Sequence, residues 1–258
     1  MDYANTFKKN GVFMPFVVLN DPTHTESLNI VKTLIDAGAD ALELGFAFSD
    51  PMADGVAIQD GHLRALKAGA CMQKNFDLLQ QIHAYSPQTP IGLLLYANLI
   101  HRYGIDKFYE TCADCGVASV LVADLPLVES TSFVSSAKKH NIAPIFIAAP
   151  HTSQKDLEQI AGLTQAYVYV LARSGVTGAS TSLGTDAKGV IAALKGFKEV
   201  PCMLGFGISK PAHAKEAHQM GANGVVCGSA VVKLIEQHLH TPPQMHAKLK
   251  DFVQGFKA

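Results

Sequence analysis

Short apolar runs alternate with longer amphipathic segments from one end of the chain to the other. The runs carry hydrophobic residues at nearly every position, which is typical of strands that are buried on both faces. They lie at residues 12–19, 41–44, 90–95, 119–123, 143–148, 167–171, 201–204 and 224–227. Because each run is too far from the next for a hairpin, the pattern predicts eight parallel strands.

The segments between these runs place their apolar residues at helical spacing. After the first run, Leu28, Val31 and Leu34 follow Thr23 and Glu26, a pair with the spacing of a helix capping box. A short helix is also expected ahead of the first strand. In addition to the helix that follows Thr23, the expected helices cover residues 4–10, 59–67, 73–85, 105–115, 130–140, 157–163, 186–194, 212–220, 231–238 and 244–256.

Eight strands, each followed by helix, predict an α/β fold: a single (β/α)8 TIM barrel that covers residues 1–258 as one domain. A doubly wound open sheet is the alternative, but no G-x-G-x-x-G follows the first strand. The connections after the second and sixth strands, residues 45–58 and 172–185, are long, and loops of this length are usually functional. In such a barrel the catalytic groups lie on the loops at the carboxyl ends of the strands.

The composition narrows the possible partners. The 258 residues are 48% hydrophobic with a net charge of -1, so no strong field would attract nucleic acid or an anionic membrane. The start of the chain lacks the pattern of a signal peptide, and no apolar run reaches membrane-spanning length. The five cysteines are scattered, and Cys112 and Cys115 have no second Cys or His pair nearby. These features predict a cytoplasmic protein without a disulfide framework or a metal site.

One acid interrupts the second apolar run. Glu43 lies inside this run, and burying a carboxylate is costly unless the group is paired or has a task. Two further acids, Asp50 and Asp54, follow on the long loop. Two interpretations stay open from these residues: an acid/base pair that acts on a substrate, or a salt-bridged strand end beside an ordinary acidic turn.

Glycines follow the last two strands. Gly205 and Gly207 end the seventh strand, and Gly228 and Ser229 lead from the eighth strand directly into a helix. Barrels often bind phosphate at these two loops, because glycine lets backbone N–H groups approach the anion at a helix N-terminus. Gly178, on the loop after the sixth strand, could add a third side. Tight turns at two helix entries are the alternative, and we favour phosphate.

Other residue types are missing from the strand ends. No Lys lies on or at the end of an expected strand, which disfavours a Schiff-base aldolase. No strand end carries a His, which disfavours a metal-dependent aldolase and a zinc hydrolase. Four histidines could lie near the loop face, namely His24, His62, His101 and His151. We interpret each of them as a surface or helix histidine.

The remaining strand ends are apolar or aromatic. Phe16, Leu94, Leu121, Ile147 and Tyr169 fall at these positions and together could form a slot for a flat ring. With a phosphate at one end and carboxylates at the other, the expected substrate is a phosphorylated aromatic compound that is changed by proton transfer.

Six motifs, in order and at the expected strand ends, carry a family resemblance. They are residues 39–45 (ADALELG), 48–51 (FSDP), 53–55 (ADG), 92–98 (GLLLYAN), 173–178 (RSGVTG) and 205–209 (GFGIS). This set resembles the tryptophan synthase alpha subunit over nearly the whole chain. The resemblance implies a retro-aldol cleavage of indole-3-glycerol phosphate to indole and glyceraldehyde 3-phosphate, with no cofactor in this chain.

The resemblance also implies roles for individual residues. Glu43 would be the main acid/base and Asp54 would hold the indole N–H. It places Phe16, Leu94, Leu121, Ile147, Tyr169, Thr177 and Phe206 against the substrate, and Gly178, Gly205, Gly228 and Ser229 around the phosphate.

A partner is implied as well. Family members bind a beta subunit that carries pyridoxal phosphate, in an αββα tetramer, and pass indole to it. The expected contacts on this chain are Asp50, Pro51, Asn98 and Pro126. The family usually has Pro where this chain has Ala47 and Val56, so the loop between them is less constrained here. A stand-alone indole-releasing lyase, a silent partner of the beta subunit and another phosphate-binding barrel enzyme are the alternatives.

Overall fold

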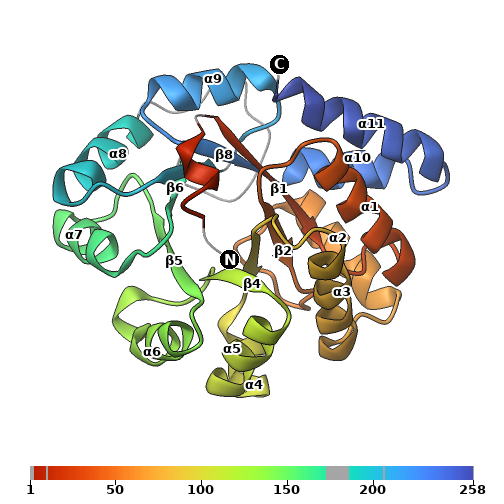
Figure 1. Ribbon diagram of the computed structural model, residues 1–258, viewed down its shortest axis with the longest axis horizontal. Helices are drawn as coiled ribbons and strands as arrows, with labels where there is room; N and C mark the ends of the chain where they lie inside the picture. Colours follow the sequence, from red (N-terminus) through yellow and green to blue (C-terminus); the bar gives the residue numbers. More distant parts are fainter. Residues whose placement is uncertain (1–2, 10, 173–185, 206, 258) are drawn as a thin grey trace.

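The computed structural model describes residues 3–9, 11–172, 186–205 and 207–257, and in it the strands close into a barrel. Each strand pairs in parallel with the next along the chain, and the last pairs with the first, as Figure 1 shows from one end. The strands are β1 (Val12–Val18), β2 (Leu42–Gly45), β3 (Ile91–Leu95), β4 (Val117–Val122), β5 (Ala143–Ala148), β6 (Val168–Leu171), β7 (Cys202–Gly205) and β8 (Gly224–Cys227). The predicted (β/α)8 barrel is therefore confirmed.

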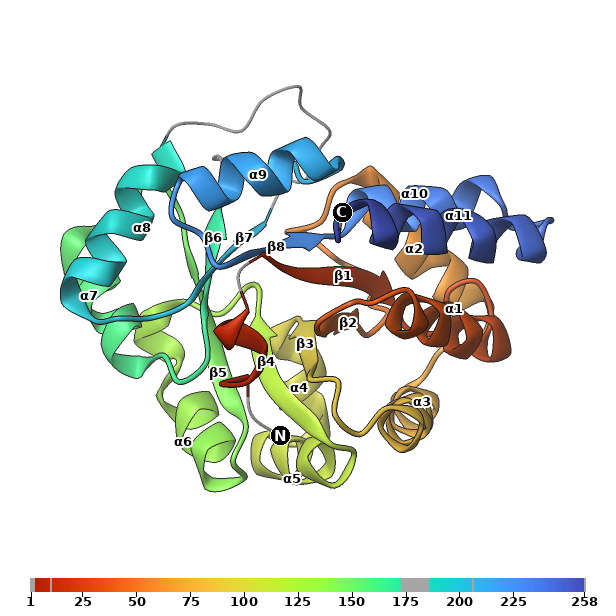
Figure 2. The same cartoon turned by 45° about the horizontal axis from the view of Figure 1, so that its top comes forward.

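The helices form a ring outside the strands (Figure 1). They are α1 (His24–Asp36), α2 (Val56–Lys67), α3 (Met72–Tyr85), α4 (Ala97–Tyr103), α5 (Ile105–Asp114), α6 (Thr131–Lys139), α7 (Gln154–Leu163), α8 (Asp186–Phe197), α9 (Pro211–Gln219), α10 (Ser229–Gln237) and α11 (Pro242–Gly255). Two short 3-10 turns, η1 (Thr6–Lys8) and η2 (Leu127–Glu129), complete the regular elements. At the end of the chain α11 packs beside α1 and α10, which closes the ring (Figures 1 and 2).

Two parts of the helix prediction were wrong. The expected helix at residues 4–10 is only the turn η1, because a short isolated segment gains little from helix formation and tertiary packing decides its shape. Here Tyr3 is buried and its ring lies 5.4 Å from that of Tyr167, so the N-terminal segment covers one end of the barrel (Figure 1). The sequence also missed α4, which begins directly after β3 and whose Ala97 N–H donates to the Asp124 carboxylate across 2.7 Å.

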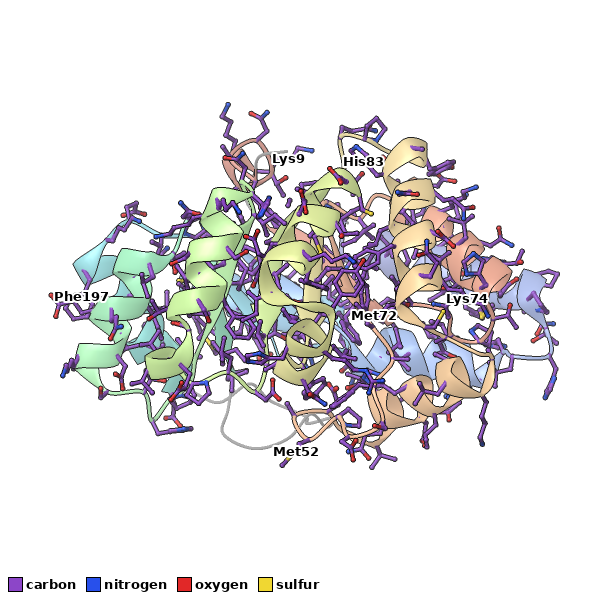
Figure 3. All side chains as sticks on the ribbon, turned by 90° about the horizontal axis from the view of Figure 1, so that it is seen from below. Lys9, Met52, Met72, Lys74, His83 and Phe197 are labelled. Atoms are coloured by element: carbon purple, nitrogen blue, oxygen red, sulfur yellow. The ribbon has the colours of Figure 1, made fainter. Side chains whose placement is uncertain are left out.

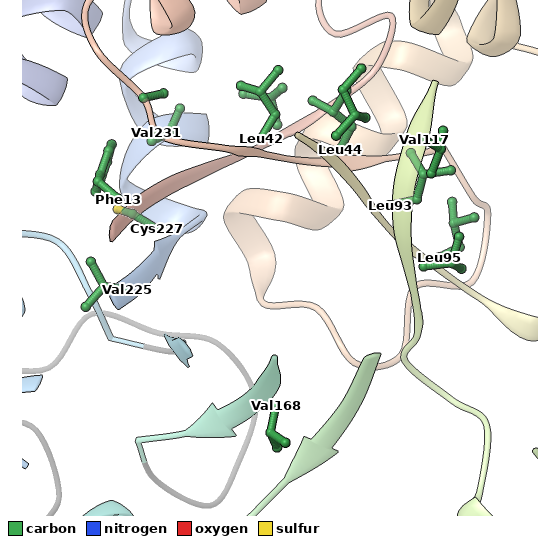
Figure 4. Packing of buried hydrophobic residues seen from close by; sticks show 14 of the residues in the cluster. Phe13, Leu42, Leu44, Leu93, Leu95, Val117, Val168, Val225, Cys227 and Val231 are labelled. Carbon is green, nitrogen blue, oxygen red and sulfur yellow. The ribbon is translucent and has the colours of Figure 1, made fainter. Parts of the chain in front are cut away.

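Alternation along the strands divides the core into two layers. On β1, Met14 and Phe16 point into the barrel and join the interior cluster, whereas Phe13 and Val17 point outward against the helices. Figure 4 shows the outer layer, in which Leu42 and other strand residues project toward the helices. Because both faces of each strand are buried, the strand sequences are nearly continuous apolar runs.

The two ends of the barrel differ in character. Met52, on the loop between β2 and α2, lies at the carboxyl end of the strands, and Lys9 and His83 lie at the opposite end (Figure 3). Within the described parts of the chain, no helix has the length and apolar character needed to cross a membrane.

Candidate active site

A cavity of about 110 Å³ opens at the carboxyl end of the barrel. Its walls come from five strands, from the loops that follow β2 and β7, and from the starts of α2 and α10. The lining residues are Phe16, Glu43, Asp54, Ile58, Leu94, Tyr169, Gly207, Ile208, Ser209, Val226, Gly228, Ser229, Ala230 and Lys233. The structure thus brings the two predicted carboxylates, Glu43 and Asp54, together with two of the predicted phosphate residues, Gly228 and Ser229.

Glu43 lies on β2, where it pairs with Phe16 on one side and Gly92 on the other. Its side chain is buried, and Oε1 receives no hydrogen bond from any residue that the structure describes. Burial first, and then the negative charge of Asp54, raise the pKa of Glu43 from 4.5 to about 8. Glu43 is therefore mainly protonated at neutral pH and can give its proton to a substrate.

Hydroxyl groups line the barrel below Glu43. The Tyr3 hydroxyl and Ser119 Oγ lie 2.8 Å apart, and a Cβ at Gly92 would come within 3.0 Å of both. Burial raises the pKa values of Tyr3 and Tyr167 well above their usual range, so both hydroxyls keep their protons. None of these residues was predicted to lie near the site, although Ser119 is a polar interruption of an apolar strand just as Glu43 is.

Asp54 is held from two sides. The Tyr96 hydroxyl donates to Asp54 Oδ2 across 2.7 Å, and His62 Nε2 lies 3.2 Å from the same oxygen. Tyr96 also accepts a hydrogen bond from the Ala53 N–H, which fixes the loop beside Asp54. Neither Tyr96 nor His62 was predicted as a site residue.

His62 is a helix histidine, one of the two expected alternatives, because it lies on α2, but it is buried rather than on the surface, with an exposure of only 2%. Helix α2 begins at Val56, immediately after Gly55, rather than at the expected residue 59. Its buried face includes Ile58, His62 and Ala65, which recur at helical spacing. That spacing was visible in the sequence and would have placed His62 on the inner face of the helix.

The glycine loops form the other end of the cavity. Gly207 and Ser209 follow β7, and Gly228 is the N-cap of α10, whose first residue is Ser229. The first N–H groups of a helix have no partner within it, so this end suits an anion. Lys233, one turn along α10, adds a positive charge to the same wall.

Gly205 is placed differently from the other predicted phosphate residues. It does not line the cavity, and a Cβ at this position would lie 2.1 Å from the Tyr169 hydroxyl oxygen. The absence of a side chain at Gly205 therefore makes room for Tyr169, which does line the cavity and belongs to the interior cluster of the barrel.

The apolar wall includes three of the predicted ring contacts, Phe16, Leu94 and Tyr169. Leu121 and Ile147 belong to the same interior cluster but do not line the cavity. Ile147 instead borders a separate apolar cavity of about 100 Å³ between β4, β5 and α6. The predicted residues Thr177, Gly178 and Phe206 lie outside the described residues.

The predicted partner contacts lie on three successive segments at the carboxyl end of the strands, after β2, β3 and β4. Asp50, Asn98 and Pro126 are exposed and Pro51 is half-buried. Two apolar side chains lie on the same loop as Asp50 and are strongly exposed, Met52 at 83% and Val56 at its end at 73%. Exposed apolar groups of this size beside a site are typical of a surface that a partner covers.

The fold and the site fit a class of protein: enzymes with a (β/α)8 barrel whose cavity at the carboxyl end of the strands combines buried carboxylates with glycine loops after β7 and β8. Comparison with known proteins gives the family. The family model of the tryptophan synthase alpha chain matches residues 3–258, and the chain belongs to this family.

Individual relatives resemble this chain in sequence over nearly their full length. The chain is 56% identical to the tryptophan synthase alpha chain of Helicobacter pylori (strain HPAG1), over 99% of both chains. It is 50% identical to that of Vibrio cholerae serotype O1, over 96% of this chain and 93% of the relative. Among solved structures, a chain of the tryptophan synthase a2b2 complex from Pyrococcus furiosus superposes with a TM-score of 0.88 at 35% identity, covering 96% of this chain and 98% of that one.

Proposed function

We propose that this chain cleaves indole-3-glycerol phosphate to indole and glyceraldehyde 3-phosphate in the cavity at the carboxyl end of the barrel. Membership of the tryptophan synthase alpha chain family makes it a carbon–carbon lyase. The observation that carries the assignment of the site is Glu43, a buried carboxyl that stays protonated near neutral pH and shares its cavity with Asp54.

Glu43 supplies the proton that starts the reaction. Without protonation the ring would have to leave as a C3 carbanion, which is a poor leaving group. The protonated Glu43 therefore first gives its proton to indole C3. The ring nitrogen then carries a positive charge, which the Asp54 carboxylate stabilises by accepting the N–H. Two carboxylates in different environments are needed because one must give a proton while the other stays charged.

The same Glu43 completes the cleavage. As a carboxylate it takes the proton from the hydroxyl on the carbon attached to indole C3, and that oxygen forms a carbonyl. The carbon–carbon bond breaks, its electron pair returns to the positively charged ring, and neutral indole and an aldehyde result. All protons and electrons are accounted for by the substrate and Glu43, so we propose that this chain needs no cofactor of its own.

The cavity orients the substrate between its two ends. Gly228 and Ser229, with the positive charge of Lys233, would hold the phosphate, and Phe16 and Leu94 would contact the ring. Six further contacts stay predictions. Three of them do not line the cavity, namely Leu121, Ile147 and Gly205. The other three lie outside the described residues, namely Thr177, Gly178 and Phe206.

The proposed partner is a tryptophan synthase beta subunit, which holds the pyridoxal phosphate and receives the indole. The Pyrococcus furiosus chain with the same fold was solved in an a2b2 complex. The exposed apolar pair Met52 and Val56, next to the predicted contacts Asp50 and Pro51, supports docking at the mouth of the cavity. Such docking would deliver indole without release to solvent.

The proposed setting is the cytoplasm. All five cysteines, Cys71, Cys112, Cys115, Cys202 and Cys227, are free thiols, which fits a reducing compartment.

Indole release from indole-3-glycerol phosphate tests the proposal, with the chain alone and with a beta subunit. Indole is extracted into an organic solvent before it is quantified, because the phosphorylated substrate carries the same indole chromophore and stays in water. We expect slow release alone and faster turnover with beta. Equal turnover in both would favour a stand-alone lyase, and no indole in either would contradict the proposed function.

A further inference from the structure

His62 occupies a buried position beside the site. It lies on the inner face of α2, and its side chain is 3% exposed. Histidine is not a preferred residue for such a position, because its ring nitrogens need partners when they are buried. Both nitrogens of His62 have one, and both partners belong to the β2–α2 loop.

The two contacts assign the tautomer. The backbone N–H of Phe48 donates to His62 Nδ1 across 3.2 Å, so Nδ1 is the unprotonated nitrogen. The proton then resides on Nε2, which donates to Asp54 Oδ2 across 3.2 Å. The loop itself thus prepares the imidazole as a donor aimed at the carboxylate.

We infer that His62 is a positioning residue that fixes the Asp54 carboxylate in the plane required to receive the indole N–H. This inference rests on the proposed function, because it assigns the task of His62 through Asp54. The His62 and Tyr96 donors come from different elements, α2 and the junction of β3 with α4, and both reach Oδ2. Among the described residues both donors therefore act on one oxygen, and Oδ1 is left to the substrate.

A second donor changes what Asp54 can do. With Tyr96 alone, the carboxylate can still turn about its last side-chain bond while it keeps one hydrogen bond. A donor on the rigid helix α2 removes this freedom, and such support of a catalytic group by its neighbours keeps the productive geometry. A neutral imidazole does so without adding a positive charge that would compete with the charge developing on the indole nitrogen.

Three substitutions separate the two contacts of His62. His62→Gln keeps an N–H donor near the position of Nε2, toward Asp54, but loses the acceptor for Phe48. His62→Asn keeps an acceptor near Nδ1 but loses the donor, and His62→Leu loses both. Each variant is assayed for indole formation with the beta subunit present, with Leu63→Gln on the exposed side of the same helix as the matched control.

The expected result is a split in kcat. His62→Leu and His62→Asn should lower kcat by about 10- to 150-fold, the effect of one hydrogen bond to a charged group. Their KM should stay within about twofold, because the N–H contact strengthens in the transition state. His62→Gln should keep most of the kcat, and Leu63→Gln all of it. Thermal unfolding of each variant is measured in parallel. If His62→Gln and His62→Asn are equally stable, their difference in kcat comes from the donor toward Asp54 and not from the stability of the fold.

Other rank orders overturn the inference. If His62→Asn keeps its kcat and His62→Gln does not, the residue acts by tethering the loop at Phe48. If all three variants match the wild type or fall equally, the donor toward Asp54 has no positioning role. A wild-type complex that does not cleave indole-3-glycerol phosphate would instead contradict the proposed function, and this is recognised before any variant is compared.

Discussion

Relative to the wild type, the Glu43→Gln variant should become more stable as the pH rises. Glu43 is buried and keeps its proton up to a pKa of about 8, whereas in the unfolded chain it ionises at its ordinary value of 4.5. Between these values the folded state binds more protons than the unfolded state, so the wild type loses stability with increasing pH. Gln has no such proton, and its contribution does not change over this range.

The size of the effect follows from the two pKa values. Each pH unit between 4.5 and about 8 costs the wild type about 1.4 kcal/mol. Over the whole window the Glu43→Gln variant should gain up to about 5 kcal/mol relative to the wild type. Below pH 4.5 both states of the wild type are protonated, and the difference levels off at whatever the exchange of hydroxyl for amide contributes.

Equilibrium unfolding in urea, followed by circular dichroism between about pH 5 and about pH 9, measures this difference. The same variant should lose at least about 10²-fold in indole formation, because the general acid is gone. A gain in stability together with a loss of activity is the signature of a group kept for function at the expense of stability.

Asp106 provides a control of opposite sign. The Lys139 ammonium first, and then the Ser136 hydroxyl and His140, lower the pKa of Asp106 to about 2 on the surface. In unfolding measurements extended down to about pH 2, Asp106→Asn should therefore destabilise the protein at neutral pH, and the loss should fade as the pH falls from 3.8 toward 2. If the Glu43→Gln difference is flat between about pH 5 and about pH 9 while the Asp106 control behaves as expected, the carboxyl of Glu43 is not desolvated and the reasoning is refuted.

The remaining predictions concern glycines and the phosphate end. In Gly228→Val the new Cβ would lie 3.3 Å from Ile58 Cδ1, and the rest of the side chain would crowd the loop. The KM for the phosphorylated substrate should therefore rise, and inorganic phosphate should inhibit less. An unchanged KM would exclude this loop as the phosphate site. Lys233→Met keeps the length of the side chain but removes the charge, and it should weaken inhibition by phosphate about 5- to 10-fold at low salt, with little difference from the wild type at high salt. Gly205→Ala should destabilise the protein by about 1–3 kcal/mol, because Tyr169 is buried and cannot yield, whereas Gly162→Ala on α7, where nothing lies within 4 Å, should be neutral or stabilising. Urea unfolding of the two variants side by side checks this pair, and equal effects would contradict the packing assigned to Gly205.

Local patterns were sufficient for the barrel and for Glu43. The strands are buried on both faces, so each appears as an apolar run, and the connecting segments show helical spacing. An acid within such a run is conspicuous because a buried carboxylate is costly, and the structure confirms that Glu43 is buried. Both signals are contained in a few consecutive residues.

The contact between Tyr96 and Asp54 was not predictable in this way. Tyr96 is 42 residues away from Asp54 along the chain, and nothing in the sequence indicates that its hydroxyl reaches a carboxylate on another loop. The N-terminal segment shows the same limit, because its shape depends on Tyr3 packing against Tyr167 and Ser119 across the end of the barrel. Contacts of this kind are set by how separate elements meet.

The two carboxylates of the cavity differ in how they are supported, and this difference fits their proposed tasks. Hydrogen bonds to a carboxylate favour its charged form, whereas burial without donors favours the protonated form. Asp54 receives donors from Tyr96 and His62, and Glu43 Oε1 receives none from the described residues. A group that must give and then retake a proton should stay free of fixed donors, because each one would hold it in a single state. A group that must stay charged and aimed should be fixed by several. Glu43, whose Oε1 has no donor among the described residues, and Asp54, which has two, therefore belong to one arrangement, and His62 contributes to it through its hydrogen bond to Asp54.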